Sequence, residues 1–197
     1  MGRVKVVLAS MNKGKLRELR ALFPEWEIAP LVTNYPDETG ATFYENARAK
    51  ARFAHGFAPE VSVVGEDSGL EVDALDGRPG IRSARFAGPD ATDEENVELL
   101  VRELEGVPDD ERAAGYVSEL VLVSPQGDEL RGRGTLEGRI TREPHGSEGF
   151  GYDPVFIPAG YEQTVAELGN AWKRENSHRA QAAKALRQRL GKLGGAV

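Results

Sequence analysis

The chain has 197 residues, 40% of them hydrophobic and 29% charged, and its 25 basic and 32 acidic side chains leave a net charge of −7. This composition excludes disordered, collagen-like and low-complexity proteins, and the length predicts a single domain, 1–197, with room for two lobes. No apolar run reaches the roughly 20 residues that span a bilayer, the acidic balance disfavours a nucleic-acid polymer, and the absence of cysteine fits a cytoplasmic protein.

The first half of the chain alternates strand and helix patterns. Short β-branched apolar runs predict strands, and apolar residues at helical spacing predict helices. Thr42 with Glu45, and Thr92 with Glu95, are capping-box patterns that open helices. The predicted elements are strands at 4–10, 27–31, 61–64 and 70–75, helices at 16–23, 42–56 and 92–105, and an ordered loop at 77–88.

The second half is richer in strands. Strand patterns at 116–123 and 129–140 flank a PQGD turn, which predicts a β-hairpin. A loop rich in glycine, proline and aromatic residues follows at 142–158. An apolar stripe that ends at Leu193 predicts a last helix over 177–193. Helices between early strands and a later hairpin predict an α/β fold with a mixed sheet.

The loop between the first strand and the first helix suits phosphate binding. Ser10, Asn12, Lys13 and Lys15 offer a hydroxyl, an amide and two ammonium groups beside the unpaired N–H groups of a helix start. The loop is not a Walker loop, because the required glycine and Ser/Thr positions hold other residues. An Asn-capped helix with solvated lysines explains the same residues equally well.

A pair of carboxylates follows the strand predicted at 61–64. In the segment GEDSG (65–69), Glu66 and Asp67 offer oxygen ligands of the kind that Mg²⁺ takes together with phosphates. Ligand sites in open α/β sheets gather at the carboxyl ends of strands. Glu38, in the loop before the next helix, offers a further oxygen. A tight turn at this segment is compatible with such a site.

Lys50 occupies an unusual place on the helix predicted at 42–56. It lies seven residues after Phe43, on the apolar stripe of that helix. A lysine there either extends along the stripe to solvent, which is the more frequent outcome, or points into a cleft. Both interpretations stay open on the residues alone.

Two later segments suit the recognition of a base. In GFGYDP (149–154) the glycines permit close backbone approach, an aromatic ring can stack on a base, and a carboxylate can accept from a ring N–H. In KRENSHR (173–179) a cation, an imidazole and a guanidinium gather at the start of the last helix. A loop packed on the core and a solvated helix start are the structural alternatives.

Taken together, these segments resemble the inosine/xanthosine triphosphate pyrophosphatase family. They follow one another in order along nearly the whole chain, so an accidental match is implausible. One departure is Glu66, where many bacterial relatives have an aspartate. The matching stretches are LASMNKGK (8–15), ETGATF (38–43), ENARAKA (45–51), EDSGL (66–70), GRPG (77–80), SAR (83–85), GFGYDP (149–154) and SHR (177–179).

The resemblance implies a fold, a cofactor and a set of site residues. The implied fold is an elongated mixed α/β sheet flanked by helices in two lobes, with the active-site cleft between them. Asp67 and Lys50 are the implied catalytic residues, with Asp67 as the base that activates water, and Glu38 and Asp67 are the implied Mg²⁺ ligands. The implied substrate-binding residues are Ser10, Asn12, Lys13, Lys15, Ser68, Phe150, Gly151, Tyr152, Asp153, Lys173, His178 and Arg179.

The implied activity is Mg²⁺-dependent hydrolysis of deaminated purine nucleoside triphosphates (ITP, dITP and XTP) to the monophosphate and pyrophosphate, by a cytoplasmic homodimer. Two alternatives stay open. One is a pyrophosphatase for pyrimidine or other modified triphosphates, and the other is a non-catalytic nucleotide sensor. The presence of Glu38 and Asp67 argues against the sensor.

Overall fold

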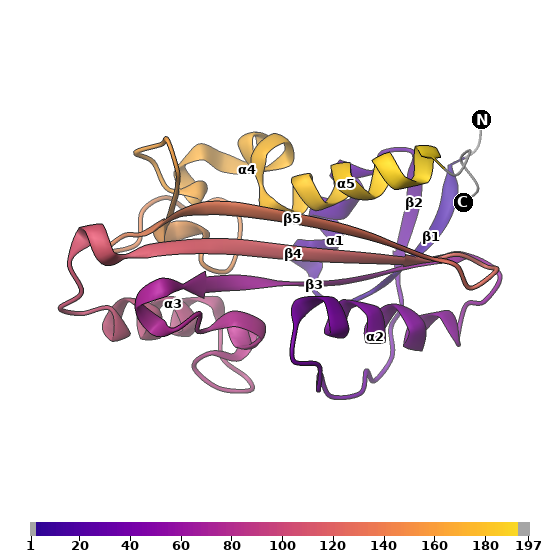
Figure 1. Cartoon of the computed structure of the whole chain (residues 1–197), viewed down its shortest axis with the longest axis horizontal. Helices are drawn as coiled ribbons and strands as arrows, with labels where there is room; N and C mark the ends of the chain where they lie inside the picture. The colour runs from indigo at the N-terminus through magenta and orange to yellow at the C-terminus, as the bar shows by residue number, and fades with distance from the viewer. Residues whose placement is uncertain (1–2, 193–197) are drawn as a thin grey trace. The chain divides into compact units, whose positions relative to one another are not determined.

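The computed structural model describes residues 3–192, which form a six-stranded sheet of order β2-β1-β3-β4-β5-β6 with helices beside it (Figure 1). β1 pairs in parallel with β2 and β3, whereas β5 and β6 pair antiparallel. The sheet is therefore mixed, and the predicted α/β class is confirmed. The strands are β1 (Val4–Ala9), β2 (Trp26–Pro30), β3 (Ser62–Val72), β4 (Ala113–Val123), β5 (Glu129–Ile140) and β6 (Phe156–Pro158).

Helix starts follow the capping residues of the sequence. The side chains of Asn12, Thr42, Thr92 and Thr164 each accept a hydrogen bond from a backbone N–H three residues later, at the start of α1 to α4. Leu193, the predicted end of the last apolar stripe, lies outside the described residues. The helices are α1 (Lys13–Leu22), α2 (Phe43–His55), α3 (Asp93–Glu103), α4 (Val165–Asn176) and α5 (His178–Lys192).

Helix α4 is absent from the sequence prediction. Gly169, at φ +81°, breaks the helical backbone in its middle, so the apolar spacing on either side does not add up to one stripe. Thr164 and Glu167 nevertheless form a complete capping box at its start. Among residues 3–192, no helix is both long and apolar enough to cross a membrane.

The prediction of two separate strands at 61–64 and 70–75 is wrong. Ser62–Val72 is one eleven-residue strand, β3, and the GEDSG segment lies in its middle rather than after its end. Polar residues interrupt the apolar pattern there. The strand nevertheless continues through them, because Glu66 bonds to Arg179 and Asp67 bonds to Lys50. The loop predicted at 77–88 contains a short 3₁₀ helix, Gly80–Arg85.

The chain divides into two compact units. The first comprises residues 1–67, 118–134 and 178–197, and the second comprises residues 68–117 and 135–177. β3, β4 and β5 each contribute residues to both units. A single catalytic domain with a cleft between two lobes stays a prediction.

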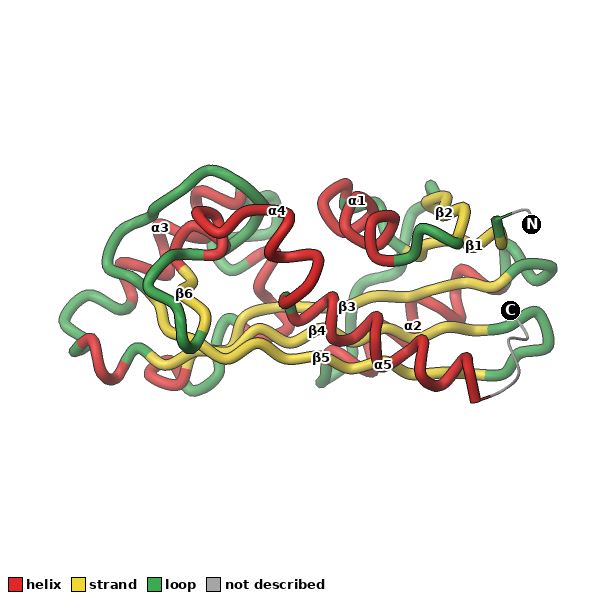
Figure 2. The backbone as a smooth tube through the Cα atoms, turned by 90° about the horizontal axis from the view of Figure 1, so that it is seen from above, coloured by secondary structure: helices red, strands yellow, loops and turns green. Residues whose placement is uncertain are grey.

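In the first unit, helices cover both faces of the sheet (Figure 1). α1 and α5 share a core with Val64 and its neighbours, while α2 packs on the opposite face, where Val63 points. α5 runs along β5 (Figure 2), and a Cβ at Gly134 would lie 2.1 Å from the backbone oxygen of His178. A Cβ at Gly65 of β3 would likewise lie 2.1 Å from a backbone oxygen of α2. Glycine therefore brings both helices close to the sheet.

The second unit has a core of its own. Buried side chains from α3, α4, β6 and the parts of β3, β4 and β5 that belong to this unit form one apolar cluster. In it the ring centres of Tyr116 and Phe156 lie 4.6 Å apart. Arg112 is also buried there, and its guanidinium donates to the backbone oxygens of Leu104, Ile140 and Thr141. These bonds satisfy the buried cation without a carboxylate.

Candidate active site

The predicted phosphate-binding loop lies at the start of α1. Asn12 is the N-cap, and its side chain accepts from the backbone N–H of Lys15 at 2.9 Å. Ser10 accepts from the backbone N–H of Asn12 at 3.2 Å. Lys13 is exposed at the first helical position, whereas the Lys15 side chain is only 14% exposed. The loop therefore combines the capping geometry with one solvated and one largely buried ammonium group.

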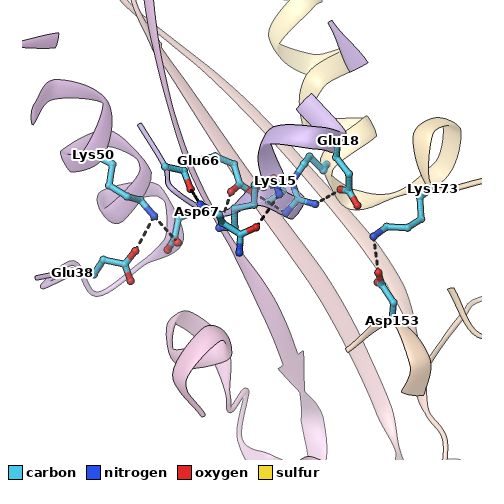
Figure 3. Close-up of polar contacts among 12 residues, drawn as sticks. Lys15, Glu18, Glu38, Lys50, Glu66, Asp67, Asp153 and Lys173 are labelled. Carbon is cyan, nitrogen blue, oxygen red and sulfur yellow. Dashed lines mark hydrogen bonds and ion pairs between the residues drawn. The ribbon is translucent and has the colours of Figure 1, made fainter. Parts of the chain in front are cut away.

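Lys50 joins the two predicted metal ligands. Its ammonium group donates to Glu38 Oε1 at 2.8 Å and to Asp67 Oδ1 at 2.9 Å (Figure 3). Asn46, one turn earlier on α2, donates to Asp67 Oδ2 at 3.2 Å and accepts from the backbone N–H of Gly40. Lys50 therefore points into this carboxylate site rather than extending to solvent.

Burial and charge set the protonation of this cluster. Burial and the nearby charge of Glu38 raise the pKa of Asp67, and together they outweigh the lowering by Lys50 and Lys15. Burial lowers the pKa of Lys50, but Asp67 and Glu38 together more than reverse the effect, so its pKa is raised. Lys50 is consequently a permanent cation, and Asp67 is a carboxylate with increased proton affinity, which suits a general base.

The donor set fits a hard divalent cation that arrives with phosphates. No cluster of three or more His, Cys, Asp or Glu side chains with metal-binding spacing occurs among residues 3–192. Mg²⁺ commonly takes one or two carboxylates and fills its other positions with water and substrate phosphates. Glu38 and Asp67 already hold the positive charge of Lys50 between them. The residues present therefore fit Mg²⁺ bound with a nucleotide.

Glu66 does not join this carboxylate pair, although it is adjacent to Asp67 in sequence. Its Oε2 lies 2.7 Å from the Lys15 ammonium, and its Oε1 accepts from Arg179 at 3.0 and 3.2 Å and from Ser118 at 3.3 Å (Figure 3). Arg179 also donates to Glu18 of α1. Glu66 therefore faces a different set of partners from Asp67, because successive residues of a strand point to opposite faces, and Glu38 and Asp67 stay the predicted metal ligands.

The predicted base-recognition loop is held together by Asp153. Its Oδ2 accepts from the Lys173 ammonium at 2.6 Å and from the backbone N–H of Phe150 at 2.9 Å, and its Oδ1 accepts from Tyr116 at 3.4 Å. The Lys173 ammonium lies 4.6 Å from the centre of the Phe150 ring. Phe150 itself is only partly buried. Asp153 and Lys173 thus fix the loop that presents this ring.

The neighbouring loop residues also have partners within their own unit. Tyr152 is buried, and its hydroxyl donates to the backbone oxygen of Ser83 at 2.8 Å; burial raises its pKa, with Asp93 adding to the effect. The backbone N–H of Gly151 donates to Asp93 at 2.7 Å. The core-packed alternative therefore describes Tyr152, whereas stacking of a base on the partly buried ring of Phe150 stays a prediction.

The structure divides the segment that was predicted to cluster at the start of the last helix. Lys173 lies in α4, whereas His178 and Arg179 open α5, because Ser177 between them is extended at φ −64° and ψ 160°. His178 and Arg179 are both buried. Ser68, also predicted to bind substrate, is partly buried in β3.

Sequence reasoning missed Asn46, Glu18 and Ser118. Asn46 precedes Lys50 by four residues and Glu18 follows Lys15 by three, so helical spacing could have placed each on the face of a predicted site residue. Ser118 lies on a predicted strand, where nothing in the sequence marks its contact with Glu66 across 52 residues.

Comparisons with known proteins identify the family of the chain. The chain matches the Ham1 family over residues 6–189. It is 45% identical to a dITP/XTP pyrophosphatase of Exiguobacterium sp. over 190 residues, which cover 93% of this chain and 95% of that protein. It is 40% identical to a dITP/XTP pyrophosphatase of Shouchella clausii, covering 94% and 96% of the two chains. The structure of the Staphylococcus aureus Ham1 protein matches with a TM-score of 0.84 at 36% identity, covering 96% of this chain and 99% of that chain.

Proposed function

This chain belongs to the Ham1 family, and we propose that it hydrolyses the deaminated purine nucleoside triphosphates dITP, ITP and XTP to the monophosphate and pyrophosphate. The observation that carries this proposal is the bridging of Glu38 and Asp67 by the Lys50 ammonium, at 2.8 and 2.9 Å. This arrangement offers a cation-binding carboxylate pair, a base and a phosphate-binding cation within one small cluster.

The residues of the first unit can perform the chemistry without a covalent intermediate. Asp67 accepts a proton from the water that attacks the α-phosphorus, and the bond from that phosphorus to the bridging oxygen of the β-phosphate breaks. Lys50 and Lys15 stabilise the charge that develops on the leaving pyrophosphate. Glu38 and Asp67 would hold Mg²⁺ together with the phosphates, and the ion would supply further positive charge and lower the pKa of water.

The residues of the second unit suit selection of the base. Phe150 offers a ring for stacking, held by Asp153 and Lys173. A pocket whose hydrogen-bond donors pair with the 6-keto oxygen of inosine would leave those donors unpaired opposite the 6-amino group of adenine. Such polar mismatches discriminate by about 10⁴-fold, which apolar pockets do not achieve.

A substrate panel tests the proposal. Turnover of ITP, XTP, dITP, ATP, GTP and dUTP is measured with Mg²⁺, and pyrophosphate is distinguished from single phosphate. Pyrophosphate release fastest from ITP, dITP or XTP supports the proposal; faster release from dUTP or ATP contradicts the specificity and favours the alternative pyrophosphatase. Chelation should abolish turnover, and Mg²⁺ should restore it.

Asp67→Asn separates catalysis from binding. The variant should bind ITP and release pyrophosphate about 10²- to 10⁴-fold more slowly, because the amide accepts no proton. If the wild type binds ITP but is as inert as the variant, the chain is a nucleotide sensor. The cytoplasmic location and the homodimeric state belong to the same proposal, and light scattering of the purified protein tests the latter.

A further inference from the structure

Glu66 is the most completely buried acid in the candidate site, and its partners are side chains of α1, β4 and α5. Its side chain is 0% exposed, and it lies between the Lys15 ammonium and the Arg179 guanidinium, whose side chains are 14% and 2% exposed. Glu18 completes this group, which we call the Glu66 network: Glu66, Lys15, Arg179 and Glu18. Two positive and two negative charges balance within it, as burial requires.

The geometry assigns each oxygen of Glu66 to a different helix. Oε2 faces Lys15 at the start of α1, and Oε1 faces Arg179 at the start of α5 and also accepts from Ser118 of β4. Both cations lie against a carboxylate that is 0% exposed, at 2.7 Å for Lys15 and 3.0 Å for Arg179. One side chain of β3 therefore fixes the direction of two cations that belong to different helices.

We infer that Glu66 is a positioning residue for phosphate binding: it holds the Lys15 ammonium in place against the fixed guanidinium of Arg179. The inference rests on the proposed function, because it assumes that Lys15 faces the phosphates of a nucleotide. Lys15 and Glu66 form an ion pair at 2.7 Å, and an ammonium group has three donors, so Lys15 can pair with an anion at the same time. A lysine held in one position loses less conformational entropy when the anion binds.

Glu66→Gln removes the charge and keeps the shape. Arg179 and Ser118 both donate to Oε1 of Glu66, so the amide oxygen of the glutamine should occupy the position of Oε1. Its NH₂ group then faces the Lys15 ammonium. Two donors then oppose each other, and Lys15 leaves its position. Glu66→Asp keeps the charge but is one methylene shorter, so it should recover much of what the glutamine variant loses.

Glu119→Gln is a matched control from the same unit. Glu119 is a buried acid on β4, 3% exposed, and it pairs with Arg131 at 2.5 Å and Arg133 at 3.4 Å. Neither of these two arginines is a predicted site residue. Loss of its charge should lower thermal stability, as for Glu66→Gln, without changing phosphate binding.

The experiment measures binding of inorganic tripolyphosphate with Mg²⁺ by calorimetry, in wild type, Glu66→Gln, Glu66→Asp, Glu119→Gln, Lys15→Gln and the double variant of positions 15 and 66. We expect about tenfold weaker binding for Glu66→Gln, a smaller loss for Glu66→Asp and none for Glu119→Gln. In the Glu66→Gln background, Lys15→Gln should add less than about threefold, because both changes remove the same positioned cation. The KM for ITP should follow the same order.

Four results would overturn the inference: binding by Glu66→Gln that is unchanged or tighter, an equal loss in Glu119→Gln, effects of the two single changes that multiply, and a wild type that binds no tripolyphosphate. The proposed function fails by a different result. If the wild type shows this coupling in tripolyphosphate binding but releases no pyrophosphate from ITP, dITP or XTP, only the proposed activity is wrong.

Discussion

Gly65→Ala tests whether close packing of α2 on β3 positions the proposed catalytic pair, Lys50 and Asp67. A Cβ at residue 65 would lie 2.1 Å from the backbone oxygen of Ala47 and 2.7 Å from the backbone nitrogen of Ala51, whereas ordinary contact begins at 3.4 Å. The obstructing atoms are backbone, so α2 must move away by about 1.3 Å. Lys50 lies on α2 and Asp67 on β3, and their 2.9 Å hydrogen bond would then exceed hydrogen-bonding distance.

The expected loss has a structural and a catalytic part. Overpacking of this kind costs about 1–3 kcal/mol of the free energy of unfolding. A displacement of about 1 Å at a catalytic group costs on the order of 10²-fold in rate. Denaturant unfolding measures the first, and kcat/KM for pyrophosphate release from ITP measures the second.

Gly191→Ala is the matched control, because a Cβ at Gly191 of α5 would meet no atom within 4 Å. This change should leave kcat/KM unaltered and raise helix stability by about 1 kcal/mol or less. If Gly65→Ala retains wild-type kcat/KM and stability, close packing of α2 does not position Lys50, and the reasoning is refuted.

Three further changes test the other contacts. Gly134→Ala places a Cβ 2.1 Å from the backbone oxygen of His178, so the start of α5 should shift and the KM for ITP should rise; an unchanged KM in a folded variant would contradict this. Lys173→Met removes the cation that pairs with the buried Asp153 and should cost about 3–5 kcal/mol of the free energy of unfolding, and an unaltered denaturation midpoint would argue against that pair. Phe150→Ala should weaken ITP binding by about 1–3 kcal/mol and leave tripolyphosphate binding unchanged, whereas equal losses for both ligands would exclude a stacking role.

The parts of the fold that follow local rules were predictable from the sequence. The helix starts at Thr42 and Thr92 carry their own capping residues, and the strand at Glu129–Ile140 follows a clear turn. β3 and α4 depend on tertiary structure instead. In β3 buried ion pairs continue the strand through polar residues, and in α4 the break at Gly169 hides the helical spacing.

The site was predictable in its residues but not in its contacts. Lys50, Glu38 and Asp67 were expected together, and the structure brings them together. The partners of Arg179 lie 113 residues away at Glu66 and 161 residues away at Glu18, and no local pattern indicates such pairings. Long-range charge pairing is therefore what the sequence alone leaves open.

The two adjacent acids of β3 show how this pairing assigns chemistry. Asp67 faces Lys50 and Asn46, and burial leaves its pKa raised. Glu66 faces Arg179 and Lys15, which overcome an even deeper burial and lower its pKa. Environments that shift the pKa values of two carboxylates in opposite directions suit the two groups to different chemical roles. The proposed proton transfer is therefore assigned to Asp67, whose pKa is raised, whereas Glu66 lies between Lys15 and Arg179, because strand alternation gives each acid a different set of neighbours.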